Sequence, residues 1–475
     1  MFAASKTASV SGGYQISRSL RFNSADSAYL NRTPASATNQ KTWTWSAWVK
    51  RGTISSLQTL FGTWSANTDA AAFAIYFNSG DTLNVLPWTN TIFTSTAVFR
   101  DPSAWYHIVV AFDSTQATAS NRITVYVNGV NQAGTYPLAV TQNANYAINS
   151  AQAHRLGDFP ASGFNTFGGY MTEVNFIDGQ ALTPSSFGYT NPSTGVWSPV
   201  KFVGTYGTNG FYLNFSDNSN TTATTLGKDY SGNGNNWTPN NFSVSAGVGN
   251  DSLVDTPTAY GTDTGVGGEV RGSYCTLNPL NSYSSITLQN GLLRYTTTQT
   301  GLNILAMATM GFSSGKWYWE VTATTVGTDN GATGIMKTSF NGQTGGTYPG
   351  YETQSVGYHT DGGKSVNGPY SLYGATYTSG DVIGIGVDCG AGTIVFYKNG
   401  VSQGVINAGI NYEWTPAQGG YNLSTPPVRD MNFGQQPFVY TNPGVNRPAS
   451  DYKALCTQNL PTPTISNGAN YMAAT

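Results

Sequence analysis

The carboxylates of this sequence do not form the acid pair that a glycoside hydrolase needs. Such enzymes place one carboxylic acid and one carboxylate on either side of the scissile bond. Glu173 and Asp178 come closest to a pair, but their odd spacing points them to opposite faces of an extended strand. Glu320 stands alone between aromatic residues. We therefore predict that the chain is not an enzyme.

Three tryptophans are candidates for a sugar-binding surface. Sites for sugars stack an exposed aromatic ring on the pyranose face and bind the hydroxyls with Asn, Asp or Gln. Trp64, Trp88 and Trp237 lie in turn-rich stretches and are the candidates for this role. The alternative for each is a core or ordinary surface position. Tryptophans within strand motifs are predicted to be buried instead, namely Trp43, Trp45, Trp105, Trp317 and Trp319.

The charge of the chain argues against a nucleic-acid partner. Lys and Arg total 21 and Asp and Glu total 23, so the formal net charge is −2 and no large basic patch is present. No stretch approaches the roughly 20 apolar residues of a membrane helix, so we expect no membrane insertion. The three Cys are odd in number and widely spaced, so they do not indicate a disulfide framework. The sequence has no Cys-x-x-Cys motif and only three His, so it does not indicate a sulfur-bound metal.

Composition and periodicity predict an all-β protein. Only 9% of the 475 residues are charged, whereas Gly (56), Tyr (29) and Phe (22) are plentiful. Residues 123–134 (ITVYVNGVNQAG) and 394–404 (IVFYKNGVSQG) each predict a hairpin, because Asn and Gly accept the positive φ of a two-residue type I′ turn. In residues 42–51 (TWTWSAWVKR), alternation places Trp43, Trp45 and either Ala47 or Val49 on one face.

Several ordered motifs of the first half carry a family resemblance. WTWSAWVKR, AWYHIVVAFD, YVNG and GGYMTEVNFIDGQALTPSSFG (168–188) resemble the laminin-G or concanavalin-A-like jelly roll, in the form common in bacteriophage structural proteins. The resemblance covers about residues 18–190. Residues 200–219 and 227–244 resemble the extension that accompanies this module in phage proteins.

The second half resembles another two-sheet sandwich, the SPRY domain. The motifs are SSGKWYWEVTA (313–323), SVGYH (355–359), SGDVIGIGVDCGAGTIVFYKNGVSQG (379–404) and MNFGQQPF (431–438). In KWYWEV, Trp317 and Trp319 face one way while Tyr318 and Glu320 face the other. We therefore expect two large apolar side chains to enter the core from this strand.

Together these patterns predict two antiparallel β-sandwich (jelly-roll) domains in tandem. A Gly-, Asp- and Thr-rich stretch marks a linker between them. Pro461 and Pro463 favour extended backbone near the end of the chain. The predicted divisions are an N-terminal arm at 1–17, the concanavalin-A-like jelly roll with its C-terminal extension at 18–244, the linker at 245–276, the SPRY-like sandwich at 277–450 and an extended C-terminal tail at 451–475.

The first resemblance implies a calcium site. Laminin-G-like sandwiches often bind Ca²⁺ at the rim of a sheet, where carboxylate and carbonyl oxygens meet the ion. Asp113, Asp158 and Asp178 flank or lie in predicted loops and are the candidate ligands. The alternative is that each caps a turn through side-chain hydrogen bonds.

The second resemblance implies a peptide site. SPRY domains generally hold peptides with the loops at one end of the sandwich, which makes Tyr348, Tyr351, Tyr370 and Tyr373 the candidate contact residues. Hydrolases built on the concanavalin-like sandwich usually carry Glu-x-Asp-x-x-Glu on one strand, and this pattern is absent. The resemblances therefore imply binding and not catalysis.

The likeness to phage proteins implies a virion structural protein of a tailed phage. We expect a fibre or adhesin that binds host-surface glycan or protein, is assembled in the host cytoplasm and is located in the virion. The alternatives are a capsid or tail decoration protein that cements virion subunits and, third, a polysaccharide depolymerase. The expected partners are other virion proteins and further copies of the chain, a trimer being the commonest fibre arrangement.

Overall fold

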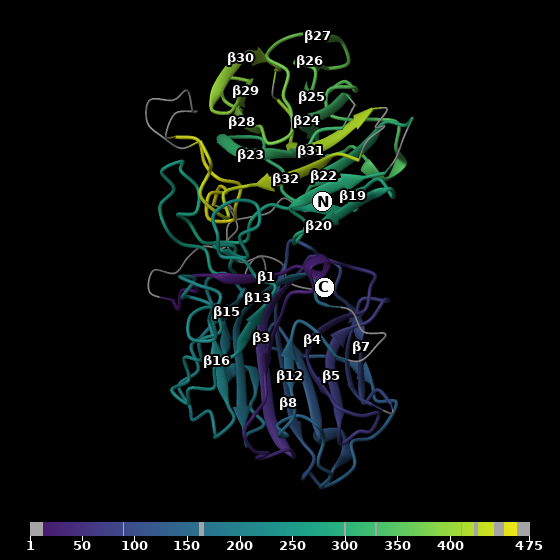
Figure 1. Ribbon diagram of the computed structural model, residues 1–475, viewed down its shortest axis with the longest axis vertical. Coiled ribbons are helices and arrows are strands. Elements are labelled where there is room, and N and C mark those ends of the chain that lie inside the picture. Colours follow the sequence, from purple (N-terminus) through teal and green to yellow (C-terminus); the bar gives the residue numbers. More distant parts are fainter. Residues whose placement is uncertain are drawn as a thin grey trace, which may run out of the picture. The chain divides into compact units, whose positions relative to one another are not determined.

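The chain is all-β, as predicted. A computed structural model describes residues 13–88, 90–160, 166–298, 301–327, 330–409, 411–421, 426–440 and 451–462 (Figure 1). These residues form antiparallel sheets and four three-residue 3-10 helices, and no helix among them is long and apolar enough to cross a membrane. They divide into two compact units, one with residues 13–245 and 249–258 and the other with residues 246–248 and 259–462. The prediction of two sandwiches in tandem is confirmed.

The first unit contains two large sheets. One has the order β10 (Val130–Asn131), β9 (Ile123–Val127), β8 (Trp105–Asp113), β3 (Thr42–Arg51), β13 (Gly169–Asp178), β1 (Ser19–Phe22), β18 (Ser252–Leu253), and β16 (Phe211–Leu213) also pairs with β13. The other has the order β11 (Gly134–Thr135), β7 (Phe93–Val98), β6 (Thr82–Pro87), β5 (Ala72–Phe77), β4 (Gln58–Trp64), β12 (His154–Leu156), β2 (Tyr29–Arg32), β17 (Thr238–Asn240). The unit also holds the ribbon of β14 (Gly188–Thr190) and β15 (Trp197–Pro199) and the helices η1 (Ser24–Asp26), η2 (Ala119–Asn121) and η3 (Pro184–Ser186).

Alternation along β3 fills the core of the first unit. Trp43 and Trp45 are fully buried, and both Ala47 and Val49 share their face. Trp43 stacks on Phe112 of the neighbouring β8, with ring centroids 4.9 Å apart. Because successive side chains of a strand point to opposite faces, the two tryptophans enter the same core layer. The expected burial of this strand face is confirmed.

The second unit also contains two large sheets. One has the order β19 (Leu277–Ser282), β22 (Ile304–Ala308), β31 (Trp414–Tyr421), β24 (Asn330–Lys337), β25 (Ser355–His359), β26 (Gly363–Val366), β27 (Tyr370–Leu372). The other has the order β20 (Ile286–Gln289), β21 (Arg294–Thr297), β32 (Val428–Asn432), β23 (Lys316–Thr325), β28 (Val382–Asp388), β29 (Thr393–Lys398), β30 (Val401–Asn407). The helix η4 (Gly342–Thr344) follows β24.

Strand β23 presents different chemistry on its two faces. Trp317 and Trp319 are 3% and 1% exposed and lie against Phe312. On the other face, the buried carboxylate of Glu320 accepts hydrogen bonds from the backbone N–H groups of Val439 and Tyr440. The predicted division of this strand into two faces is confirmed.

The two Asn-Gly sequences form the predicted hairpin turns. Asn128 and Gly129 have φ of 50° and 80°, and Asn399 and Gly400 have φ of 49° and 79°. The first turn joins β9 to β10 and the second joins β29 to β30. Positive φ at both central residues is the requirement of the type I′ turn, which explains the choice of Asn and Gly.

Much of the predicted linker, residues 245–276, is folded. In the first unit, Asp251 and Asp255 form buried ion pairs with Arg21 and Lys50, at 3.0 and 2.8 Å. In the second unit, the backbone of Tyr274 forms an isolated antiparallel β-bridge with Cys456, so part of the predicted tail 451–475 is also packed. The predicted boundaries remain predictions, and residues 1–12, 441–450 and 463–475 of the predicted arm, sandwich and tail lie outside the described residues.

Candidate binding surface

The three tryptophans predicted to bind sugar do not form one surface. Trp237 is 1% exposed and packs in the core against Phe211, with ring centroids 4.8 Å apart. Trp64 and Trp88 are half-buried and pack against the same small cluster, which includes Tyr76. The turn-rich context of Trp237 therefore did not keep its ring at the surface.

The three aspartates predicted to bind Ca²⁺ are held by hydrogen bonds within the chain. Asp113 accepts from Thr115 and Gln116. Asp158 pairs with Arg155. Asp178 accepts four hydrogen bonds, from Thr38, Asn39, Asn149 and Asn209. Among the described residues, no three His, Cys, Asp or Glu side chains lie close enough together to hold a metal ion.

The serine–histidine contact of the first unit has the wrong proton arrangement for a nucleophile and its base. His107 Nε2 lies 2.9 Å from Ser46 Oγ, but Trp197 Nε1 donates to His107 Nδ1 at 3.0 Å. The proton of the neutral ring therefore sits on Nε2, which donates to the serine oxygen and does not accept from it. Burial lowers the pKa of His107 to about 3, so the ring stays neutral.

The chain contains two Gly-x-Ser-x-Gly sequences, at 311–315 and 400–404. A nucleophile elbow places its serine on a sharp turn from a strand into a helix. The first sequence precedes β23, and Ser402 of the second lies in the edge strand β30. Neither has the backbone context of a nucleophile elbow.

Three of the four predicted tyrosines meet on the second unit. Tyr351 lies 5.1 Å from Tyr348, which lies 5.8 Å from His359, which in turn lies 5.6 Å from Tyr370, between ring centroids. These four residues are called the tyrosine row below. Tyr351 and Tyr370 are 47% and 54% exposed, whereas His359 is buried beneath them. The row is thus an aromatic surface with two open rings.

The tyrosine row lies on the outer face of its sheet. Tyr358 of β25 packs on Phe396 of β29, which belongs to the opposite sheet. The next residue, His359, therefore points outward. Tyr373 lies on the inner side, since its ring contacts Tyr358 and Phe396. The structure separates Tyr373 from the other three predicted tyrosines, and it adds His359, which strand alternation could have indicated.

Two glycines allow the row to lie flat on the sheet. A Cβ at Gly357 would lie 2.0 Å from the carbonyl oxygen of Pro349, so only glycine lets the loop that carries Tyr348 and Tyr351 approach β25. A Cβ at Gly363 would lie 2.2 Å from the ring of Tyr370. The rings are therefore held in place before any partner binds, which lowers the entropic cost of binding.

The polar atoms of the row are fixed as well. The hydroxyl of Tyr370 donates to Asp361 Oδ2 at 2.9 Å. His359 Nε2 lies 2.9 Å from Ser365 Oγ. Burial, followed by the hydrogen bond to Asp361, raises the pKa of the Tyr370 phenol, so this group stays neutral. The row offers apolar ring faces with hydroxyl groups at their edges, which is typical of protein contact surfaces.

A buried carboxylate in the first unit is the other unusual titrating group. Glu173 has φ of 53° and lies in β13 where the register against β3 shifts between Thr172 and Asn175. Its Oε2 atom accepts hydrogen bonds from Tyr212 at 2.7 Å and from Tyr14 at 2.9 Å. Burial raises the pKa of Glu173 to about 7, although the two tyrosine hydroxyls oppose this shift.

We predict that Glu173 makes the first unit less stable as the pH rises. Its pKa in the folded state is raised above the ordinary 4.5, so the folded chain binds more protons than the unfolded chain between pH 4.5 and about 7. The protonated carboxyl of Glu173 gives its full contribution to the free energy of unfolding below pH 4.5. This contribution, about 3 kcal/mol at most, is lost as the pH rises through about 7. Glu173→Gln should therefore stabilise the chain in mild alkali and have little effect in mild acid.

The measurement is urea unfolding of wild type and Glu173→Gln at several values of pH. The difference between the two free energies of unfolding isolates this carboxylate from the other titrating groups. A difference that does not change with pH would show that Glu173 is ionised throughout.

Comparison with known proteins agrees with the two sandwiches. Residues 316–415 match the model of the SPRY domain, and residues 23–186 match that of the concanavalin A-like lectin/glucanases superfamily. Ran-binding protein 10 of Danio rerio is 36% identical over 172 residues, which cover 34% of this chain and 28% of the relative. Ran-binding protein 9 of Homo sapiens is 34% identical over 172 residues, which cover 34% and 23%. A solved SPRY domain of human HERC1 has a TM-score of 0.29 at 20% identity and covers 33% of this chain and 96% of the other.

These relatives overturn the expectation of a phage virion protein. The curated proteins that match include Ran-binding proteins 9 and 10 of animals, which are not virion components. The fibre or adhesin role, the decoration role, the virion partners and the virion location were all inferred from the phage resemblance, and they are wrong with it. The chain spans less than a third of the length of these two Ran-binding proteins. What the family matches show is a concanavalin A-like domain followed by a SPRY domain.

Proposed function

We propose that this chain is a non-catalytic protein-recognition module that binds a peptide segment through the tyrosine row. The observation that carries the proposal is the pair of exposed rings, Tyr351 and Tyr370, at the outer face of the sheet. Gly357 and Gly363 allow the close approach that keeps these rings against the sheet. Exposed tyrosines with fixed rings supply large contact area at a low entropic cost. The names of the Ran-binding relatives support a role in protein binding.

The arrangement favours binding over catalysis for a chemical reason. The described histidines are buried, and the two whose shifts are resolved, His107 and His154, have lowered pKa values because of burial. A general base needs a pKa near the working pH and access to its substrate. At the tyrosine row the Tyr370 hydroxyl already donates to Asp361, so the row offers exposed ring faces for contact and no general base.

The proposal predicts that Tyr370→Ala weakens peptide binding about 30-fold. Peptides would be selected from a random displayed library against the full chain, and their dissociation constants measured by fluorescence anisotropy. Truncation of a central aromatic contact typically costs about 2 kcal/mol, which is about 30-fold in affinity. Tyr351→Ala should have an effect of similar size.

Tyr412→Ala is the matched control. Tyr412 is 37% exposed in the same unit but is not part of the tyrosine row, and its ring lies under the amine of Lys337. Its removal should leave the dissociation constants unchanged. Selected peptides that bind Tyr370→Ala and Tyr351→Ala as tightly as wild type would place the contact surface elsewhere and overturn the proposal.

A further inference from the structure

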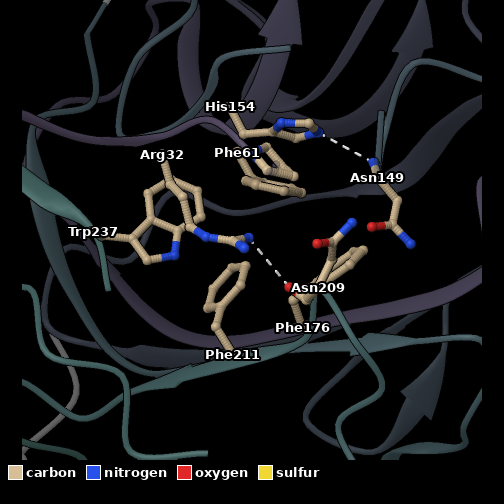
Figure 2. A pocket seen from close by; sticks show the side chains of 9 residues that line it. Arg32, Phe61, Asn149, His154, Phe176, Asn209, Phe211 and Trp237 are labelled. Atoms are coloured by element: carbon tan, nitrogen blue, oxygen red, sulfur yellow. Dashed lines mark hydrogen bonds between the residues drawn. The ribbon is translucent and has the colours of Figure 1, made fainter. Parts of the chain in front are cut away.

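The first unit contains a small pocket between side chains of both sheets. Figure 2 shows the guanidinium of Arg32 between Trp237 on one side and Asn149 and Asn209 on the other. Three phenylalanine rings complete much of the wall. The empty space of about 240 Å³ includes the opening to solvent, and the part enclosed by the lining holds only about one water molecule. Any occupant must therefore be small.

The pocket contains a positive charge without a close counter-ion. Arg32 donates a hydrogen bond to the carbonyl oxygen of Asn209 (Figure 2). It also donates to Asn235 Oδ1, and both acceptors are neutral. No Asp or Glu among the described residues lies within ion-pair distance of Arg32. Burial lowers the pKa of Arg32, although the more distant charge of Asp229 opposes the shift. The fold thus partly removes a guanidinium from water without pairing its charge.

The indole of Trp237 adds a second free donor. Its ring lines the pocket and is 1% exposed, and its N–H has no hydrogen-bond partner among the described residues. His154 adds no charge, because burial lowers its pKa to about 4 and its Nε2 accepts the backbone N–H of Asn149. Arg32 and Trp237 are therefore the hydrogen-bond donors that remain to attract a ligand.

Asn149 contributes an acceptor to the same pocket. Its amide nitrogen donates to the carbonyl oxygen of Asn39 at 2.9 Å and to Asp178 Oδ1 at 2.6 Å, which fixes the orientation of the amide. Its buried Oδ1 atom has no partner among the described residues. Water could satisfy this oxygen and the indole N–H, but it would add no negative charge beside Arg32 to that of the more distant Asp229. An anion would in addition offset the positive charge of the half-buried Arg32, which a water molecule cannot do.

We propose that this pocket binds chloride, between the guanidinium of Arg32 and the indole N–H of Trp237. Chloride is small enough for the enclosed space, and both groups are donors that suit an anion. Binding would stabilise the first unit by mass action, because the site does not exist in the unfolded chain.

The direct test is the width of the chloride NMR line in solutions of the full chain. Sodium chloride is titrated against sodium gluconate at constant ionic strength, since gluconate is too large for the pocket. Wild type should broaden the line in a saturable way, and bromide should reverse the broadening. Arg32→Gln should weaken chloride binding about tenfold or more, because hydrogen bonds to a charged group are worth about 1.5–3 kcal/mol.

Arg155→Gln is the matched control. Arg155 lies on the neighbouring β12 but is already paired with Asp158, so its loss should leave chloride binding intact. Broadening that is absent in wild type, or equal in wild type and Arg32→Gln, would overturn the proposal and leave water as the occupant. If Arg32→Gln does not fold, bromide-soaked crystals of wild type decide the question. An anomalous peak beside Arg32 and Trp237 supports the site, and its absence overturns it.

Discussion

Trp319→Ala should lower the free energy of unfolding of the second unit by about 3–5 kcal/mol. The ring is 1% exposed, lies 6.3 Å from Phe312 between ring centroids, and comes from β23, which is paired on both sides by β28 and β32. Truncation to alanine removes the buried ring and leaves a cavity that these paired strands cannot close. Since a domain is stable by only about 5–15 kcal/mol, a loss of this size threatens folding.

The measurement is urea unfolding of the full chain, followed by fluorescence and circular dichroism. Trp64→Ala is the control, because it removes the same ring from a half-buried position in the first unit and should cost clearly less. An unchanged midpoint for Trp319→Ala would show that the ring is not part of the core.

The elements that the sequence predicted well are those fixed by local geometry. The two Asn-Gly hairpins follow from the need for positive φ at two successive residues. The buried faces of β3 and β23 follow from alternation, which places Trp43 with Trp45 and Trp317 with Trp319. In each case neighbours in sequence carry the information, so no knowledge of the tertiary structure is needed.

The burial of Trp237 could not be predicted from its neighbours. The stretch before it, SGNGNNW, indicates turns, and turn residues describe the backbone and not what covers a side chain. Strand β17, which begins directly after Trp237, pairs with β2 far back in the sequence, and the ring packs on Phe61 and Phe211 of two other strands. Long-range pairing therefore decides the exposure of this ring.

The tyrosine row illustrates the same limit at the candidate site. The sequence placed Tyr348, Tyr351, Tyr370 and Tyr373 in one group because they lie in nearby loops. The structure divides them by the face of the sheet, since Tyr373 packs toward Phe396 and the others meet over His359. The phage context failed for a different reason: one sandwich fold serves many unrelated functions, so likeness of fold does not give the setting.

The ion pair between Arg51 and Asp81 leads to the second large effect that we predict. Both side chains are fully buried, and the Nη1–Oδ1 distance is 2.9 Å. Asp81 also accepts from Arg100 at 2.8 Å and from the backbone N–H of Ser55 at 2.6 Å. Burial alone would raise the pKa of Asp81, but these hydrogen bonds and the charge of Arg51 lower it below 3.8. The carboxylate thus stabilises the fold above this pH, and its contribution is lost as the pH falls through the lowered value.

Asp81→Asn should destabilise the first unit by about 3–5 kcal/mol, because it leaves the guanidinium of Arg51 buried without a counter-ion. Two nitrogens of Arg51, Nε and Nη2, already lack partners among the described residues, so the side chain has little capacity to compensate. Arg100→Gln removes the other partner of the same carboxylate, but Arg100 is half exposed, and its loss should cost about 1 kcal/mol or less.

A double variant separates the lost ion pair from the unpaired charge. Arg51→Met removes the guanidinium and keeps an unbranched side chain beside the ring of Phe77, which the guanidinium now covers at 4.3 Å. If the cost of Asp81→Asn arises from an uncompensated charge, Arg51→Met combined with Asp81→Asn should be more stable in urea than Asp81→Asn alone. If the double variant is instead less stable by the sum of both single effects, the two residues contribute independently, and the charge argument fails. The relative stabilities of these variants therefore test why Asp81 is needed. Either the attraction between Arg51 and Asp81 stabilises the fold, or Asp81 only neutralises a buried arginine.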